Sequence, residues 1–209
     1  MTLKVKICGL QDEAALAAAV EGGAAYIGFV FFPPSRNFIT VATARMLAAL
    51  APKHIMKTGL FVDARDDEVR AVLDAVPLDL LQLHGQETPE RIAAIRAVTG
   101  LPVMKALRLK SPEHFAAIPA YAAVADRLLF DSRIGDEPSG GPINWSSLKG
   151  RAFGKPWMLA GGLTAENVAE AVALSGATSV DVSSGVEDAT GRKSPAKIRE
   201  FLAVATGLG

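Results

Sequence analysis

Residues 78–106, LDLLQLHGQETPERIAAIRAVTGLPVMKA, contain the unit from which the fold of this 209-residue chain can be predicted. The unit starts with a short apolar run, Leu78–Leu83, and continues through a helix candidate, Pro89–Val98, to a second apolar run, Val103–Ala106. The threonine just before the helix candidate can cap its first turn, and Gly100 is typical of the residue that ends a helix. The segment therefore predicts a strand, a helix and another strand, in this order.

The same alternation continues in both directions along the chain. We expect strands at Lys4–Cys8, Tyr26–Phe31, Met56–Val62, Leu78–Leu83, Val103–Ala106, Arg127–Asp131, Trp157–Ala160 and Ser179–Ser183. We expect helices at Asp12–Glu21, Val41–Leu50, Asp66–Ala75, Pro89–Val98, Pro112–Tyr121, Trp145–Lys149, Ala165–Leu174 and Pro195–Ala205. The strand candidates are apolar runs without alternation, which indicates strands covered on both faces.

This succession of strand–helix units predicts a single-domain (β/α)8 barrel, or TIM barrel, of the α/β class over residues 1–209. The alternative is an open doubly wound sheet, which usually carries a glycine-rich loop after its first strand. The corresponding segment here, Cys8-Gly9-Leu10-Gln11, is not such a loop. No change in composition marks a second domain, so we favour the barrel.

Composition excludes several classes of protein. The 22 Lys and Arg residues balance the 22 Asp and Glu residues, so nothing indicates a general affinity for nucleic acid or anionic membranes. A single cysteine forms no internal disulfide and no four-cysteine zinc site, and the three histidines show no metal-binding spacing, so we expect no metal site. The sequence shows neither a secretory signal nor a membrane-spanning apolar stretch, and we expect a cytoplasmic protein.

The predicted barrel places polar residues from several strand ends around one rim, where barrels carry their active sites. Two of these segments, Gly161-Gly162 and Ser183-Ser184-Gly185, precede a helix or helical turn. Backbone N–H groups at such positions favour an anion, and barrels often bind phosphate after their seventh and eighth strands. The alternative interpretation is a tight turn followed by helix caps. Because both segments follow the appropriate strands, we favour phosphate binding.

Three further residues at or in strand ends are candidates for chemistry. Cys8 can serve as a thiolate base or nucleophile, or it can be a small buried apolar residue. Asp131 follows an apolar run, where desolvation would raise its pKa and suit a general acid, although a turn-capping aspartate would look the same. Asp181 lies inside the last strand and can accept hydrogen bonds from backbone or serine groups near the phosphate site.

Two long loops follow strand ends and are candidate lids. The first, 32–38, contains Arg36, whose guanidinium can clamp a carboxylate or phosphate or can simply be solvated. The second spans 132–142. His84, after the fourth strand, is of a type that more often makes structural hydrogen bonds than acts as a catalyst.

Taken together, these segments closely resemble the phosphoribosylanthranilate isomerase family, a barrel family of tryptophan and thus aromatic amino-acid biosynthesis. The similarity runs from the first strand to the last and covers essentially the whole chain. The matching stretches are Lys4-Val5-Lys6-Ile7-Cys8-Gly9, Gly28-Phe29-Val30-Phe31, Gln82-Leu83-His84-Gly85, Phe130-Asp131-Ser132, Ala160-Gly161-Gly162-Leu163 with Asn167-Val168, and Asp181-Val182-Ser183-Ser184-Gly185-Val186-Glu187.

The resemblance implies an Amadori rearrangement of N-(5-phosphoribosyl)anthranilate to 1-(2-carboxyphenylamino)-1-deoxyribulose 5-phosphate, without metal or organic cofactor. By analogy, Asp131 is the general acid and Cys8 the general base. Arg36 would bind the anthranilate carboxylate, with His84 also at the substrate. The phosphate site would comprise Gly161, Gly162, Asp181, Ser183, Ser184 and Gly185. The expected partner is this small phosphorylated molecule, and we expect a monomer, with a dimer as the alternative.

Two loops depart from the family pattern. The family usually has Ser-x-Arg in the loop after the second strand, whereas here Ser35 is followed directly by Arg36 and then Asn37. Either the loop shifts by one residue or Asn37 takes the place of the arginine. We favour Arg36, because the carboxylate still needs a cation. In the second loop the family's Gly-Gly-x-Gly and Phe-Asp-Trp read Gly140-Gly141-Pro142-Ile143-Asn144-Trp145.

Two other functions remain compatible with the sequence. Another sugar-phosphate isomerase or epimerase would share the barrel, but the histidine-pathway type carries an aspartate where this chain has Cys8, and metal-dependent epimerases need a His/Asp cluster. A non-catalytic phosphosugar-binding barrel would use the same phosphate loops, with Cys8 and Asp131 purely structural.

Overall fold

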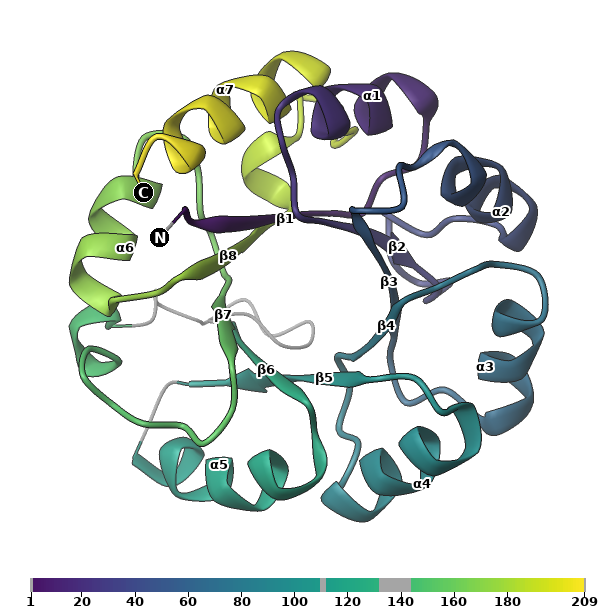
Figure 1. Cartoon of the computed structure of the whole chain (residues 1–209), viewed down its shortest axis with the longest axis vertical. Coiled ribbons are helices and arrows are strands. Elements are labelled where there is room, and N and C mark those ends of the chain that lie inside the picture. Colours follow the sequence, from purple (N-terminus) through teal and green to yellow (C-terminus); the bar gives the residue numbers. More distant parts are fainter. Residues whose placement is uncertain (1, 110–111, 132–143, 209) are drawn as a thin grey trace.

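The computed structural model describes residues 2–109, 112–131 and 144–208. Parallel strands form a closed barrel in which each strand pairs with the next along the chain and the last pairs with the first (Figure 1). The strands are β1 (Lys4–Cys8), β2 (Tyr26–Val30), β3 (Met56–Phe61), β4 (Leu80–Leu83), β5 (Val103–Arg108), β6 (Arg127–Asp131), β7 (Trp157–Leu159) and β8 (Ser179–Val182). The predicted (β/α)8 barrel is thus confirmed, with strand ends that differ from the expected ones by at most two residues.

The helices form a ring outside the strands (Figure 1). They are α1 (Glu13–Glu21), α2 (Val41–Leu50), α3 (Asp66–Leu73), α4 (Pro89–Thr99), α5 (Pro112–Val124), α6 (Val168–Ser175) and α7 (Pro195–Thr206). The expected caps are present: the Thr88 hydroxyl accepts a hydrogen bond from the backbone N–H of Arg91, and Gly100 ends α4 with φ of 69°.

Three predicted helices differ by more than two residues in the structure. The helix expected to end at Tyr121 continues to Val124 as α5. The segment Trp145–Lys149 forms only a 3-10 turn, η1 (Trp145–Ser147), and Gly150 then adopts φ of 75°, a left-handed conformation that does not continue a helix. The helix expected from Ala165 begins at Val168, because the Asn167 side chain accepts from the Thr164 N–H at 2.8 Å and donates to the Gly162 carbonyl at 3.0 Å. These bonds form a separate turn before α6.

The apolar core has two layers. The larger one lies between the strands and the surrounding helices, and a smaller one fills the barrel interior with Tyr26, Leu80, Met104, Ala106, Leu129, Met158 and Ala160. All residues of β2 are buried, as expected for a strand covered on both faces. Because side chains two residues apart on a strand share a face, the inward positions continue upward into the polar residues at the strand ends.

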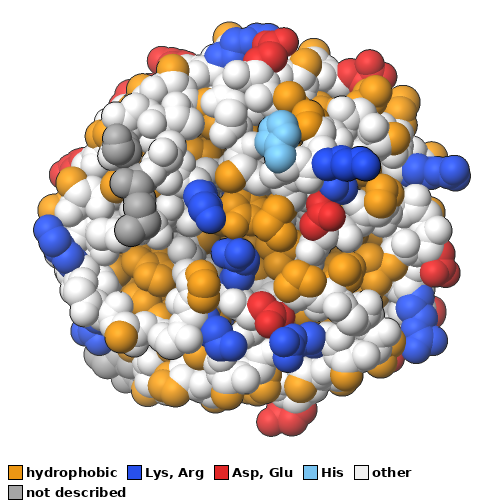
Figure 2. All heavy atoms as spheres, viewed as in Figure 1, with side chains coloured by type: hydrophobic (Ala, Val, Ile, Leu, Met, Phe, Trp, Pro, Cys, Tyr) orange, Lys and Arg blue, Asp and Glu red, His pale blue; other side chains and the backbone are white. Residues whose placement is uncertain are grey.

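The predicted loop 132–142 lies outside the described residues. Within the part of the chain that the structure describes, no helix is long and apolar enough to cross a membrane. On the face shown in Figure 2, Lys and Arg side chains are interspersed with Asp and Glu, and apolar atoms lie near the middle.

Candidate active site

The carboxyl ends of the strands surround a cavity of about 470 Å³, continuous with a smaller pocket of about 80 Å³. Asp131, Asp181 and Ser183 line both. The cavity is further lined by Cys8, Val30, Phe32, Pro34, Ser35, Asn37, Leu60, Val62, Asp63, Gln82, His84, Gly85 and Gln86, and the pocket by Ala160, Gly161, Gly162, Leu163 and Ser184. One site therefore has a mixed apolar and polar compartment beside a small compartment lined by two carboxylates, two serines and two glycines.

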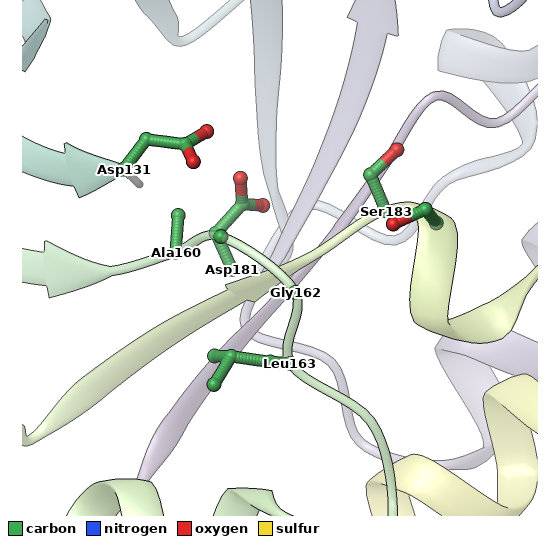
Figure 3. A pocket seen from close by; sticks show the side chains of 8 residues that line it. Asp131, Ala160, Gly162, Leu163, Asp181 and Ser183 are labelled. Atoms are coloured by element: carbon green, nitrogen blue, oxygen red, sulfur yellow. The ribbon is translucent and has the colours of Figure 1, made fainter. Parts of the chain in front are cut away.

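The small pocket is enclosed by the segments that follow β7 and β8 (Figure 3). Gly161 and Gly162 have φ of 92° and 73°, which side chains other than glycine rarely adopt. Among the described residues, no group accepts a hydrogen bond from the backbone N–H of Gly162 or Ser184. These donors, beside a pocket of this size, suit a phosphate group.

Gly185 is not among the residues that line the cavity or the pocket, but its backbone contributes to the shape of the pocket. A Cβ on Gly185 would lie 1.9 Å from the Leu163 carbonyl oxygen, so the backbones after β7 and β8 approach as closely as only glycine permits. The structure therefore places Gly185 as the contact between the two phosphate-side loops.

Lys193 supplies a buried cation next to this pocket, and sequence reasoning missed it. Its Nζ donates to Ser183 Oγ at 3.1 Å and to Asn37 Oδ1 at 3.2 Å, and it pairs with Glu187. Lys193 is 4% exposed. Because the Ser183 hydroxyl accepts from Lys193, its own proton is free to point toward an anion in the pocket.

Cys8 lies in the cavity wall and is buried. Burial raises the pKa of the Cys8 thiol above its ordinary value; the Lys6 ammonium lowers it, and the Asp181 carboxylate raises it. Lys6 itself is fully buried and its Nζ donates to Asp181 Oδ1 at 2.9 Å. Sequence reasoning expected Asp181 to accept from backbone or serine groups, and the structure gives it a lysine partner instead.

Asp131 and His84 face each other across the cavity. His84 Nε2 lies 3.6 Å from Asp131 Oδ2, and His84 Nδ1 lies 2.8 Å from Gln82 Nε2. An amide nitrogen only donates, so in this orientation Nδ1 accepts and Nε2 carries the proton that points toward Asp131. In Figure 3 the Asp131 and Asp181 carboxylates extend into the same space from β6 and β8.

Arg36 lies away from the cavity lining. Its guanidinium pairs with Glu187 Oε2, and its side chain is 63% exposed. Asn37 instead lines the cavity, and its amide donates to Glu187 Oε1 at 3.3 Å. Of the two residues that sequence reasoning considered for carboxylate binding, the structure thus brings Asn37 to the cavity and leaves Arg36 at its edge.

Eight of the ten predicted site residues line the joined cavity and pocket, the exceptions being Arg36 and Gly185. Sequence reasoning missed Lys6, Gln82 and Lys193. A signal existed for two of them, because Lys6 precedes Cys8 by two residues and Gln82 precedes His84 by two, which places each pair on one strand face. Within the described ranges, no three His, Cys, Asp or Glu side chains gather in a way that could hold a metal ion.

Comparison with known proteins gives a consistent result. Residues 5–204 match the family model described as N-(5'-phosphoribosyl)anthranilate (PRA) isomerase. The N-(5'-phosphoribosyl)anthranilate isomerase of Paramagnetospirillum magneticum is 53% identical over 212 residues, which cover 99% of each chain.

Solved structures agree. Phosphoribosyl anthranilate isomerase from Thermotoga maritima superposes with a TM-score of 0.89 at 32% identity, covering 99% of this chain and 100% of that one. A phosphoribosyl anthranilate isomerase in complex with reduced 1-(o-carboxyphenylamino)-1-deoxyribulose 5-phosphate superposes with a TM-score of 0.86 at 31% identity, with the same coverage.

Proposed function

Because this chain belongs to the N-(5'-phosphoribosyl)anthranilate isomerase family, we propose that it catalyses the Amadori rearrangement of N-(5'-phosphoribosyl)anthranilate in tryptophan biosynthesis. The product is 1-(2-carboxyphenylamino)-1-deoxyribulose 5-phosphate. The single observation that carries the proposal for this site is that Cys8 and Asp131 line one cavity that joins a phosphate-sized pocket. The relative with a bound reduced product analogue supports the same substrate class.

The phosphate would occupy the small pocket. Backbone N–H groups of Gly162 and Ser184 and the Ser183 hydroxyl are available as donors, and Lys193 adds positive charge. Gly161 and Gly185 would shape this pocket through their backbones. Asp181 carries a negative charge toward the same space, so we assign it to holding Lys6 rather than to direct contact with the phosphate.

Ring opening would begin at Asp131. Its protonated carboxyl gives a proton to the furanose ring oxygen, and the bond between this oxygen and C1 breaks as the anthranilate nitrogen forms a Schiff base with C1. The neighbouring His84 Nε2–H then stabilises the resulting Asp131 carboxylate across 3.6 Å. His84 would in this way act at the substrate site without itself transferring a proton.

Cys8 would remove the C2 proton as a thiolate. The electron pair of the C2–H bond forms the C1–C2 double bond, the Schiff-base nitrogen is neutralised, and the enolamine tautomerises to the ketone. A raised thiol pKa makes the thiolate a stronger base than an ordinary one, at the expense of its abundance at neutral pH. Acid and base thus come from different strands, β6 and β1, which β7 and β8 separate in the barrel.

The anthranilate ring would lie against the apolar part of the cavity wall, formed by Val30, Phe32, Leu60 and Val62. We propose that Arg36 binds the anthranilate carboxylate, for which its guanidinium must leave Glu187 and reach the cavity. Asn37 already lines the cavity, and its amide can donate a hydrogen bond to the same carboxylate. Both residues belong to the loop after β2, which would therefore set recognition of this end of the substrate.

The proposal is tested with purified protein and freshly generated N-(5'-phosphoribosyl)anthranilate in the absence of added metal. We expect the fluorescence of the substrate to fall as it is converted, and the product to be identified by mass and chromatography. Saturable binding without turnover would favour the non-catalytic phosphosugar-binding barrel instead.

We further propose that the protein is a monomer in the cytoplasm. Sedimentation would check the oligomeric state, and cell fractionation would check the location.

A further inference from the structure

Lys6 places a fully buried ammonium group inside the barrel, one layer below the cavity. Its exposed fraction is 0%, and its Nζ donates to Asp181 Oδ1 at 2.9 Å. The two residues are direct register partners on β1 and β8. Burying an ion pair is costly, and a hydrophobic pair of similar volume often stabilises a fold as well or better. A role of Lys6 in the reaction would explain why this buried charge is retained.

The ammonium also faces the Cys8 thiol. Lys6 and Cys8 lie two residues apart on β1 and share its inward face. Cys8 is in register with Gly28 on β2, and a Cβ on Gly28 would lie 3.1 Å from both Cys8 Sγ and Lys6 Nζ. The sulfur and the nitrogen therefore both border the space that a side chain at position 28 would occupy.

The charges around the thiol act in opposite directions. Burial and the Asp181 carboxylate raise the pKa of Cys8, while the ammonium groups of Lys6 and Lys193 lower it. Burial disfavours the charge on Lys6, but Asp181 and Cys8 together raise the pKa of Lys6, so it stays protonated. The remaining titratable residues that line the cavity are Asp63 after β3, His84 just after β4 and Asp131 on β6.

We propose that Lys6 is a positioning residue of the isomerase, whose ammonium stabilises the Cys8 thiolate and whose pairing with Asp181 holds that ammonium beneath the sulfur. The inference rests on the proposed role of Cys8 as the base. When the thiolate takes the C2 proton, the sulfur becomes neutral and the Lys6–Asp181 pair remains balanced. The Lys6–Asp181 pair therefore holds a positive charge beside the Cys8 thiolate, and neither residue has to move during the reaction.

A purely structural role is the alternative, since other buried ion pairs occur in the described residues, among them Lys193–Glu187 and Lys105–Glu87, the latter with 2.6 Å between Nζ and Oε2. The test therefore needs a readout other than stability. Cys8 is the single cysteine of the chain, so the ultraviolet absorbance of a thiolate, measured against Cys8→Ser, reports its ionisation alone.

We expect Lys6→Met to shift the titration midpoint of Cys8 upward by at least about one pH unit, which lowers the thiolate fraction near neutral pH about tenfold. The value of kcat should fall by up to about tenfold, because the thiolate fraction falls tenfold while the thiolate that remains is a stronger base, and KM should change little. Lys6→Arg keeps the charge and should restore part of the shift.

Lys57→Met is the matched control. Lys57 is 8% exposed on β3 and pairs with Asp79 at 2.6 Å, so its replacement also removes a buried lysine from an ion pair, away from the cavity lining; the Asp79 side chain is 40% exposed. It should leave the Cys8 midpoint and kcat unchanged. If Lys6→Met has the wild-type midpoint and loses no more activity than this control, Lys6 is structural and the inference is wrong.

A double variant, Lys6→Met with Asp181→Asn, keeps the inference testable if the single variant fails to fold, because it leaves no unpaired buried charge. Since Lys6 acts on the thiol more strongly than Asp181, the midpoint should still rise. A midpoint at or below that of wild type would overturn the inference. Retained turnover in Cys8→Ser would instead remove Cys8 as the base, an outcome independent of the titration.

Discussion

At the scale of single residues, the site must supply a proton at one position and remove one at another. Asp131 extends from the end of β6 beside His84, and Cys8 lies at the end of β1 above a buried lysine. A carboxyl and a thiol in such different surroundings can hold opposite protonation states during one reaction. The predictions at this scale concern these two groups.

Replacing either group should remove one proton transfer and leave binding intact. We expect Cys8→Ser and Asp131→Asn each to lower kcat at least about 100-fold, the low end for a positioned acid or base. KM should change little, because both variants keep the shape of the cavity. Steady-state kinetics with the fluorescent substrate would measure this, and a variant with nearly normal kcat would show that its residue is not the acid or the base.

The pH dependence of Cys8 reactivity follows from its surroundings. Because burial raises the pKa of the thiol, the thiolate forms only as pH rises past the ordinary value of about 8.5. We expect the rate of alkylation by iodoacetamide to keep increasing above that pH. The single cysteine makes the reaction easy to follow by mass. A rate that levels off below about pH 8 would contradict the raised pKa.

At the scale of elements, the segments after β7 and β8 form the phosphate pocket together. The backbone after β7 turns through two glycines of positive φ, and Gly185 lets the segment after β8 approach Leu163. Figure 3 shows Gly162 and Leu163, after β7, around the same pocket as Asp181 and Ser183, at the end of β8. Neither segment would form the pocket alone, so the pocket depends on this contact.

Gly162→Ala tests this pocket, and Gly150→Ala is its matched control. Both glycines have nearly the same φ, 73° and 75°, and neither has an atom within 4 Å of an added Cβ. Both variants should lose about 1–2 kcal/mol of unfolding free energy from the left-handed conformation. Only Gly162→Ala should also raise KM, about tenfold, and weaken inhibition by inorganic phosphate. Equal kinetics for the two variants would place the phosphate elsewhere.

The loop after β2 decides how the substrate carboxylate is held. Arg36→Met should raise KM at least about tenfold if the guanidinium leaves Glu187 for the carboxylate, because a charge-assisted hydrogen bond contributes about 1.5–3 kcal/mol. Asn37→Ala should raise it less, since its amide is neutral. The reverse order in the measured KM values would assign the carboxylate to Asn37.

At the scale of the whole molecule, the barrel is held closed by contacts between the two ends of the chain. β1 pairs with β8, and α1 packs against α7 beside this junction (Figure 1). Phe201 of α7 is completely buried in the layer between helices and strands. The last helix therefore contributes to closure as well as to the core.

Phe201→Ala should lower the free energy of unfolding by about 3–5 kcal/mol, because it removes a large buried side chain and leaves a cavity. Val204→Ala, in the same helix but 37% exposed, should change it by less than about 1 kcal/mol. Urea denaturation followed by circular dichroism would compare the two. Similar losses for both would show that α7 contributes little through its buried face.

Much of the fold could be predicted from sequence because its signals are local. An apolar run such as Tyr26–Phe31 needs cover on both faces, and Thr88 and Gly100 mark helix ends through bonds within one turn. The segment at Trp145–Lys149 was predicted wrongly, because whether so short a stretch winds as an α-helix depends on its neighbours. For the same reason the late start of α6, set by Asn167 and Gly162, had no separate signal.

The sequence by itself determined the order of strands and helices, and with it the residues that stand at the strand ends. The tertiary structure alone decided which side chains meet there. Lys6 and Asp181 lie 175 residues apart and pair because β8 closes onto β1 in one particular register. Register depends on the packing of the whole barrel, and shifting one strand by a single residue would turn its inward side chains outward. The same packing brought Asn37 to the cavity and left Arg36 with Glu187, which no local pattern encodes.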